Sequence, residues 1–135
     1  MARPQIIRKI CNPPKMKGFR PYGICAQNII VNKLRLEEFE SIRLINYELL
    51  DQSEAAGRMN ISRPTFTRIY NNALKQIAKS FVEGKAIEIE GGNYCLDKEW
   101  YRCKNCFRLI EGMKNHGRSR HCTSCGENEL VKINL

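Results

Sequence analysis

The sequence predicts a mainly α-helical fold with small β elements, organised as a three-helix helix-turn-helix domain, a short β-hairpin and a C-terminal zinc ribbon. Between residues 36 and 84, apolar residues recur every three or four positions, which is the period of a helix. Residues 85–98 alternate apolar and acidic side chains before a Gly-Gly pair, a pattern typical of a hairpin. The segment 99–135 contains two closely spaced pairs of cysteines, which indicate a metal ribbon.

Residues 1–35 precede these units and are predicted to form a basic, proline-containing arm. They contain eight Lys and Arg residues and no acidic residue. Their four prolines lack an amide donor and fix φ, which excludes long helices and favours extended backbone. Within the arm, residues 28–34 include a β-branched run that predicts one short strand.

Three helices are predicted in the domain over 36–84. A single apolar stripe indicates the first helix, and its members are Leu36, Phe39, Ile42, Ile45 and Leu49. The second helix is short and opens at Asp51, with Glu54 placed as in a capping box. The third helix follows Ser62, a favourable N-cap, and is predicted to run to about Val82 and to stop at Gly84.

A tight turn between the second and third helices completes the helix-turn-helix pattern. Ala55 and Ala56 are small enough for the third helix to cross the second closely, and Asn60 tolerates the left-handed conformation that a sharp turn needs. At about 100° per residue, the third helix has a buried face and an opposite polar face. The buried face comprises Phe66, Ile69, Ala73 and Ile77. The polar face comprises Arg68, Asn71, Asn72, Lys75 and Lys79.

The charge and this pattern together predict a DNA-binding protein. The net charge of +9 and the sequence pI of about 9.4 indicate a polyanionic partner. A recognition helix over residues 62–82 is expected to lie in the major groove, where arginine reads guanine and asparagine reads adenine. The alternative is an amphipathic helix whose polar face only meets water. The predicted DNA-contact residues are Ser62, Arg63, Thr65, Thr67, Arg68, Asn71, Asn72, Lys75 and Lys79, with Arg3 of the arm entering a minor groove.

The chain also resembles a prokaryotic family of uncharacterised, predicted DNA-binding proteins whose helix-turn-helix is similar to region four of sigma factors. The resemblance covers about residues 2–96, and the family usually has glycine where this chain has Asn60. It implies the fold and a DNA-binding role, without an operator or a regulon. The matching elements are Arg3-Pro4, Arg43-Leu44, Gln52, Glu54-Ala55-Ala56, Met59, Ser62-Arg63, Thr65-Phe66, Arg68, Ala78, Glu83-Gly84-Lys85-Ala86 and Glu90-Gly91-Gly92-Asn93-Tyr94.

Four cysteines predict a structural Zn(II) site, with one ion per chain. Cys103, Cys106, Cys122 and Cys125 have the C-x2-C-x15-C-x2-C spacing of a zinc ribbon. Two such turns place four thiolates at the corners of a tetrahedron and leave no open position. Iron in a rubredoxin-like site is the alternative, and disulfides are less expected in a cytoplasmic chain. His116 and His121 are treated as loop residues, and Cys11, Cys25 and Cys95 as small apolar fillers.

The leading functional prediction is a transcriptional regulator that binds double-stranded DNA in the cytoplasm, in association with the nucleoid. The alternatives are an RNA-binding or ribosome-associated zinc-ribbon protein and an adaptor that binds RNA polymerase. A helix-turn-helix favours duplex DNA, because the deep, narrow major groove of A-form RNA excludes a helix. No nucleophile–base pair, phosphate loop or open metal site is found in the sequence, so an enzyme is not expected. RNA polymerase and a second copy of the chain are the further partners considered, and no membrane association is expected.

Overall fold

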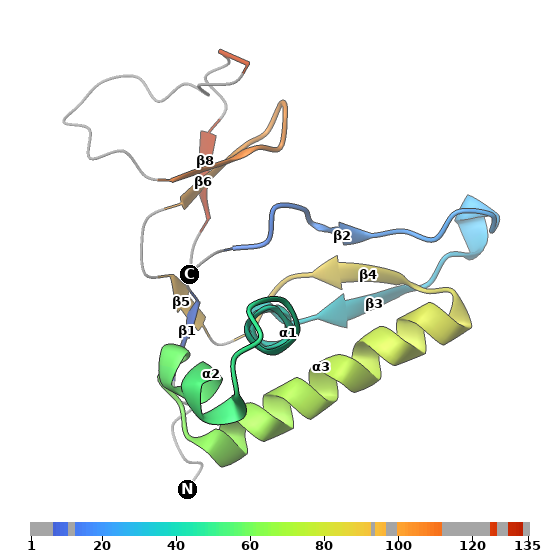
Figure 1. Ribbon diagram of the computed structural model, residues 1–135. Helices are drawn as coiled ribbons and strands as arrows, with labels where there is room; N and C mark the ends of the chain where they lie inside the picture. Colours follow the sequence, from blue (N-terminus) through green and yellow to red (C-terminus); the bar gives the residue numbers. More distant parts are fainter. Residues whose placement is uncertain are drawn as a thin grey trace, which may run out of the picture.

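The structure is a computed structural model that describes residues 7–10, 13–92, 94–96, 100–111, 125–126 and 130–133. Its helices are α1 (Leu36–Ile42), α2 (Gln52–Arg58) and α3 (Arg63–Glu83), with a 3-10 turn η1 (Ala26–Asn28) and a π-helical turn η2 (Arg43–Tyr47). Its strands are β1 (Arg8–Ile10), β2 (Gly18–Phe19), β3 (Val31–Leu34), β4 (Ala86–Ile89), β5 (Tyr94–Leu96), β6 (Trp100–Cys103), β7 (Leu109–Glu111) and β8 (Leu130–Ile133). The described chain is therefore mixed α/β, with three helices and several small sheets, rather than mainly α (Figure 1). Among the described helices, none is long and apolar enough to cross a membrane.

The predicted hairpin over 85–98 is wrong, because its two strands lie in different sheets. β4 is the central strand of a three-stranded sheet, antiparallel to β2 and parallel to β3, whereas β5 pairs in parallel with β1. Between β4 and β5, Gly91 and Gly92 have φ of 74° and 106°. A Cβ on Gly92 would lie 3.3 Å from Arg35 Cβ, so the glycine pair lets the chain pass close to the start of α1 instead of turning back.

The segment predicted as an arm is part of the same packed unit in its described residues. The strand predicted within residues 28–34 is confirmed as β3, and β1 and β2 also pair with strands that follow α3. Ile10 of β1 is fully buried. These pairings join residues separated by more than fifty positions, so the sequence pattern of the arm alone contains no signal for them.

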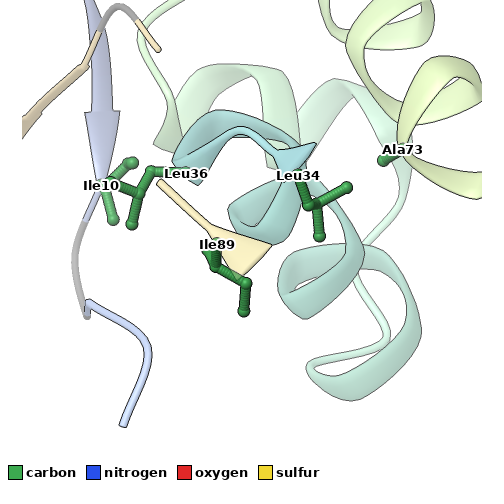
Figure 2. Packing of buried hydrophobic residues seen from close by; sticks show 5 residues of the cluster. All are labelled: Ile10, Leu34, Leu36, Ala73 and Ile89. Carbon is green, nitrogen blue, oxygen red and sulfur yellow. The ribbon is translucent and has the colours of Figure 1, made fainter. Parts of the chain in front are cut away.

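The main apolar cluster lies where these strands meet the helices. Its buried members, contributed by β1, β3, α1, α3 and β4, are Ile10, Leu34, Leu36, Ala73 and Ile89 (Figure 2). α3 runs along β3 and β4 (Figure 1). Polar contacts also join β3 to α3. The Asn32 side-chain amide donates to the Gln76 backbone carbonyl at 3.2 Å and to Ser80 Oγ at 2.9 Å. This packing fixes the direction of α3.

The first helix departs from its predicted stripe after Ile42. Here η2 continues the chain with a π-type bond, in which the Glu48 N–H donates to the Arg43 carbonyl at 2.9 Å. A π turn holds more residues than an α turn, so the phase of the stripe shifts. Leu44 is fully buried as a result, whereas Leu49 is 81% exposed and lies beyond the helix end with φ of 60°. The prediction that Leu49 belongs to the buried stripe is therefore wrong.

Candidate nucleic-acid interface and metal centre

Local sequence signals build the unit formed by α2, the turn and α3. The Glu54 N–H donates to Asp51 Oδ1 at 2.8 Å, which caps α2 and lowers the pKa of the Asp51 carboxyl. Asn60 has φ of 57°, the left-handed conformation predicted for the turn. At the start of α3, the Thr65 N–H donates to Ser62 Oγ at 3.4 Å. The predicted start of each helix is therefore confirmed by its cap.

A second apolar cluster holds α3 against α2. Its buried members are Leu44, Ala55, Ala56, Met59 and Phe66. The methyl side chains of Ala55 and Ala56 leave room for α3 to cross closely, as their size predicts. Ile61, in the turn, packs half-buried against the same cluster. The close packing therefore determines how α3 projects from the rest of the molecule.

One exposed face of α3 carries four of the predicted contact residues. Arg68, Asn71, Lys75 and Lys79 are all exposed and lie within about 80° of one another around the helix axis. Arg63 is exposed at the N-terminal end of the helix, beside the exposed Ser62. The face therefore presents cations and an amide along one side of the helix, with no acidic residue among them.

Three other predicted contact residues are engaged within the protein. The Thr67 hydroxyl donates to Gln52 Oε1 at 2.5 Å and so joins α3 to α2. The Asn72 amide donates to Glu38 Oε2 at 2.7 Å and so joins α3 to α1. Thr65 is half-buried. The structure therefore does not bring Thr67 and Asn72 to the exposed face, whereas the Thr65 hydroxyl accepts from Arg68 at 3.3 Å and lies beside that face. Arg3 lies outside the described residues.

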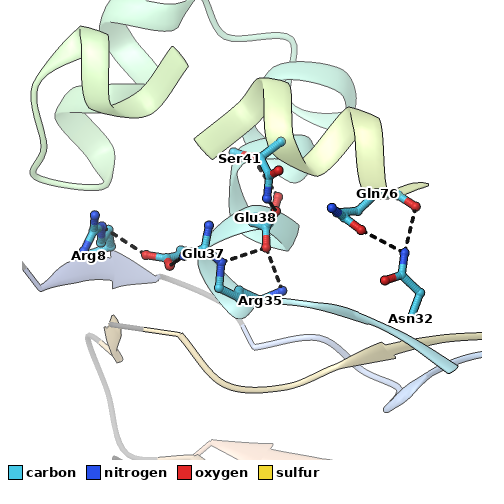
Figure 3. A network of polar contacts seen from close by, with 8 residues as sticks. Arg8, Asn32, Arg35, Glu37, Glu38, Ser41 and Gln76 are labelled. Atoms are coloured by element: carbon cyan, nitrogen blue, oxygen red, sulfur yellow. Dashed lines mark hydrogen bonds and ion pairs between the residues drawn. The ribbon is translucent and has the colours of Figure 1, made fainter. Parts of the chain in front are cut away.

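Three glutamates of α1 are buried and pair with arginines, a residue type that is usually found on the surface. Glu37, Glu38 and Glu40 are 1%, 2% and 0% exposed. Arg8 Nε lies 3.0 Å from Glu37 Oε2, and Arg35 lies within ion-pair distance of both Glu37 and Glu38 (Figure 3). Glu37 and Glu38 are therefore interior counterparts to two cations of the predicted arm, whereas Glu40 pairs with Arg43 of η2.

This pairing changes which cations of the arm are available to a partner. Arg8 and Arg35 are held by the buried carboxylates, and Lys33 pairs with Glu90 at 2.5 Å. In contrast, Lys9 is exposed, and its backbone N–H donates to the Met59 carbonyl at 3.0 Å. β1 thus places Lys9 beside the turn between α2 and α3, next to the exposed Arg58. Sequence reasoning missed this position, because only a contact across fifty residues brings it there.

Three of the four predicted metal ligands lie together at the end of β6. The Sγ atoms of Cys103, Cys106 and Cys125 lie within 4.8 Å of one another, and the Cys103 and Cys125 Sγ atoms are 3.6 Å apart. Two thiolates on one tetrahedral zinc ion, with Zn–S bonds of about 2.3 Å, would be about 3.8 Å apart. The Cys106 N–H also points at Cys103 Sγ, at 3.5 Å, as in metal-binding turns. These three thiols can therefore hold a metal ion.

The rest of the predicted ribbon is described in part. β6 is the central strand of an antiparallel sheet, with β7 on one side and β8 on the other. Cys122, the fourth predicted ligand, lies outside the described residues, as do His116 and His121. Of the cysteines predicted as apolar fillers, Cys25 is exposed and Cys95 half-buried, while Cys11 is outside the described residues. An apolar filling role is therefore wrong for Cys25.

Comparisons with known proteins place the chain among relatives from bacteria and archaea. A family model described as "Protein of unknown function DUF134" matches residues 1–97. The "UPF0251 protein" of Chloroherpeton thalassium is 37% identical over 100% of this chain and 89% of its own length. That of Halothermothrix orenii is 39% identical over 94% of this chain and 96% of its own length. That of Methanothermobacter thermautotrophicus is 35% identical over 96% of this chain and 67% of its own length. No solved structure matches.

Proposed function

The chain belongs to the family described as protein of unknown function DUF134, and on the basis of its exposed surfaces we propose that it is a sequence-specific DNA-binding protein that regulates transcription. In this proposal the N-terminal half of α3 lies in the major groove of double-stranded DNA and reads base edges. The later turns of the helix contact phosphates, which fix the register of the protein on the duplex. The protein acts in the cytoplasm, at the nucleoid, and catalyses no reaction.

One observation carries this proposal: a tight turn holds α3 against α2 so that Arg68, Asn71, Lys75 and Lys79 share its exposed face. The four side chains supply the donors that base edges and phosphates accept. Lys9 and Arg58, both exposed beside the turn, would extend the cationic surface toward the backbone of the DNA. RNA binding and binding to RNA polymerase are the competing functions, and both predict that no preferred duplex site exists.

We include a metal ion in the proposal, namely one structural Zn(II) per chain, bound by Cys103, Cys106 and Cys125 with Cys122 as the fourth ligand. Soft thiolates select zinc or iron over harder cations. We prefer zinc because zinc bound by four thiolates stabilises the fold and the ion undergoes no redox chemistry. A purified protein that is red and contains iron would overturn the choice of metal without affecting the helix-turn-helix proposal.

Recognition of the base sequence and binding to phosphates should depend on different residues of α3. Changing Arg68 to Ala is expected to weaken binding to the preferred sequence by about 1–3 kcal/mol and to weaken binding to random DNA much less. Changing Lys75 to Ala is expected to weaken binding to all sequences about equally and to flatten the slope of log K against log salt by roughly 0.9. Site selection from a random duplex library, followed by salt titrations of each variant, measures both effects.

Ser53→Ala, at an exposed position on α2, is the control and should leave binding unchanged. If the Arg68 variant keeps the wild-type site preference while the Lys75 variant alters it, the placement of α3 in the groove is wrong. If the wild-type protein selects no duplex site at all, the regulator proposal fails. The RNA-binding and adaptor functions would then take its place.

A homodimer is also part of the proposal, because a palindromic site needs two copies of the reading helix. Phe81 and Val82, near the C-terminal end of α3, are 86% and 80% exposed. Changing Phe81 to Ser is expected to raise the dimer dissociation constant at least about tenfold, as loss of an aromatic anchor does. Phe19→Ser, on β2, is the matched control. Sedimentation equilibrium tests this, and a wild-type protein that stays monomeric would contradict it.

A further inference from the structure

An exposed aromatic residue lies on the cysteine-bearing turn. Phe107 directly follows Cys106, is 55% exposed, and belongs to neither of the two apolar clusters of the described residues. The turn joins β6 to β7, in the sheet that Figure 1 shows on the opposite side of β2 and β4 from α3. The position is therefore separate from the face of α3 that we propose for duplex DNA.

The backbone of Phe107 has a conformation that costs free energy for an aromatic residue. Its φ is 61°, in the left-handed region that glycine adopts without strain. The turn itself uses only the backbone of this residue, whose N–H donates to the Cys103 carbonyl at 2.9 Å. Glycine would close the same turn at lower cost, so the turn does not account for the ring. Strain of this kind motivates a search for a function of the side chain.

Four cations of the described residues lie in or beside this turn. Lys17 Nζ lies 5.7 Å from the centre of the Phe107 ring, and Arg102 donates to the Phe107 carbonyl at 3.0 Å. Arg102 also donates to the Lys15 carbonyl at 3.0 Å, which brings that part of the chain to the turn. Lys104 is exposed within the turn itself. No carboxylate of the described residues forms an ion pair with any of the four.

The charge and the ring together favour a single-stranded nucleic acid. A zinc ion with four thiolates would carry a charge of about −2, so four cations leave the surface positive. Charge alone would also suit an acidic peptide, but the exposed ring adds a surface for a flat group. A single strand supplies both, because its bases are free to stack on an aromatic ring while its phosphates meet the lysines. The bases of a duplex are already stacked on one another.

We propose that Phe107, Lys15, Lys17 and Lys104 form a binding site for single-stranded nucleic acid. One base stacks on the Phe107 ring, on the face away from Lys17, and the lysines pair with the neighbouring phosphates. The site tolerates different sequences, because every base presents a π face. It does not depend on whether α3 binds duplex DNA.

Two labelled strands of equal length and charge test the proposal on the full-length protein as purified. One is a short oligothymidylate, and the other is an abasic strand with the same phosphates. Fluorescence anisotropy is expected to show the oligothymidylate bound at least about fivefold more tightly, because only its bases stack. Phe107→Leu should abolish this preference, whereas Tyr22→Leu, at an exposed aromatic residue outside the site, should retain it. An oligouridylate measured alongside distinguishes RNA from DNA as the tighter ligand.

Salt titrations test the phosphate contacts. Lys17→Ala and Lys104→Ala should each weaken binding of both strands and flatten the slope of log K against log salt by roughly 0.7. Lys33→Ala, the same charge change on β3, should leave the slope unchanged. Lys75→Ala should also leave it unchanged, which separates this site from the one proposed on α3. Loss of single-strand binding in the Lys75 variant alone would place the strand on α3 and overturn the proposal.

Phe107→Gly separates the role of the ring from that of the turn. Glycine relieves the strained φ, so this variant should fold and keep its metal as well as the wild type does, yet lose the preference for bases. Circular dichroism and metal content verify the fold of every variant. The proposal is overturned if the wild type binds both strands equally, or if Phe107→Leu and Phe107→Gly keep the preference. Equal binding of both strands, with displacement by a polyglutamate peptide, would identify an acidic protein as the partner instead.

Discussion

Replacing Arg43 with methionine is expected to lower the free energy of unfolding by about 3–5 kcal/mol. Arg43 donates two hydrogen bonds to Glu40, at 2.9 and 2.7 Å, and the Glu40 side chain is 1% exposed. Removing the guanidinium would leave a buried carboxylate without its counter-ion. The same pairing, chiefly the hydrogen bond to Glu40, raises the pKa of Arg43 above its ordinary value, so the guanidinium stays charged beside the carboxylate.

Guanidinium denaturation followed by circular dichroism measures this loss. Changing Glu40 to Leu as well should recover much of it, because an apolar pair of similar volume needs no counter-ion. Lys33→Ala is the control, since Lys33 and Glu90 form an exposed pair whose removal should cost less than about 1 kcal/mol. If the Arg43 variant is no less stable than the control, the buried pair does not support α1 in the way that the structure indicates.

The ends of α3 show what local sequence signals can predict. Ser62 caps the helix, and Gly84 ends it with φ of 69°, as predicted from the residue types alone. Asn60 in the turn and the cysteine pair at 103 and 106 were likewise predictable, because each depends on residues close in sequence. Such signals predict the helices and the turn between the two cysteines without knowledge of the remaining fold.

The pairing of the strands and the pairing of the charges were not predictable in this way. β1 and β5 are three residues long, too short for a period to show, and their pairing is parallel across more than eighty positions. Helical phase likewise placed Asn72 with the outward-facing residues, but α1 packs beside α3 there and Glu38 accepts from its amide. Residue spacing within one segment does not predict which element packs beside a helix, or which residue pairs with a polar or charged side chain.

Changing Cys103 to Ser is expected to reduce bound zinc from about one ion per chain to nearly none, with an affinity loss of at least about 100-fold. Cys103 is the fully buried member of the cysteine group, and its Sγ lies 3.6 Å from that of Cys125. A hydroxyl is a harder and poorer zinc ligand than a thiolate. A chromogenic chelator measures the metal, and Cys25→Ser, at an exposed position outside the group, is the control that should keep it.

The helices should survive this loss of metal, because their two apolar clusters are built without any residue of the cysteine-bearing sheet. Circular dichroism at the helical minimum should therefore change little in the Cys103 variant, while the Arg102 hydrogen bonds to Pro14 and Lys15 would weaken with the sheet. Global unfolding of the variant would contradict the independence of the helices. A metal content equal to that of the Cys25 control would instead show that Cys103 is not a ligand.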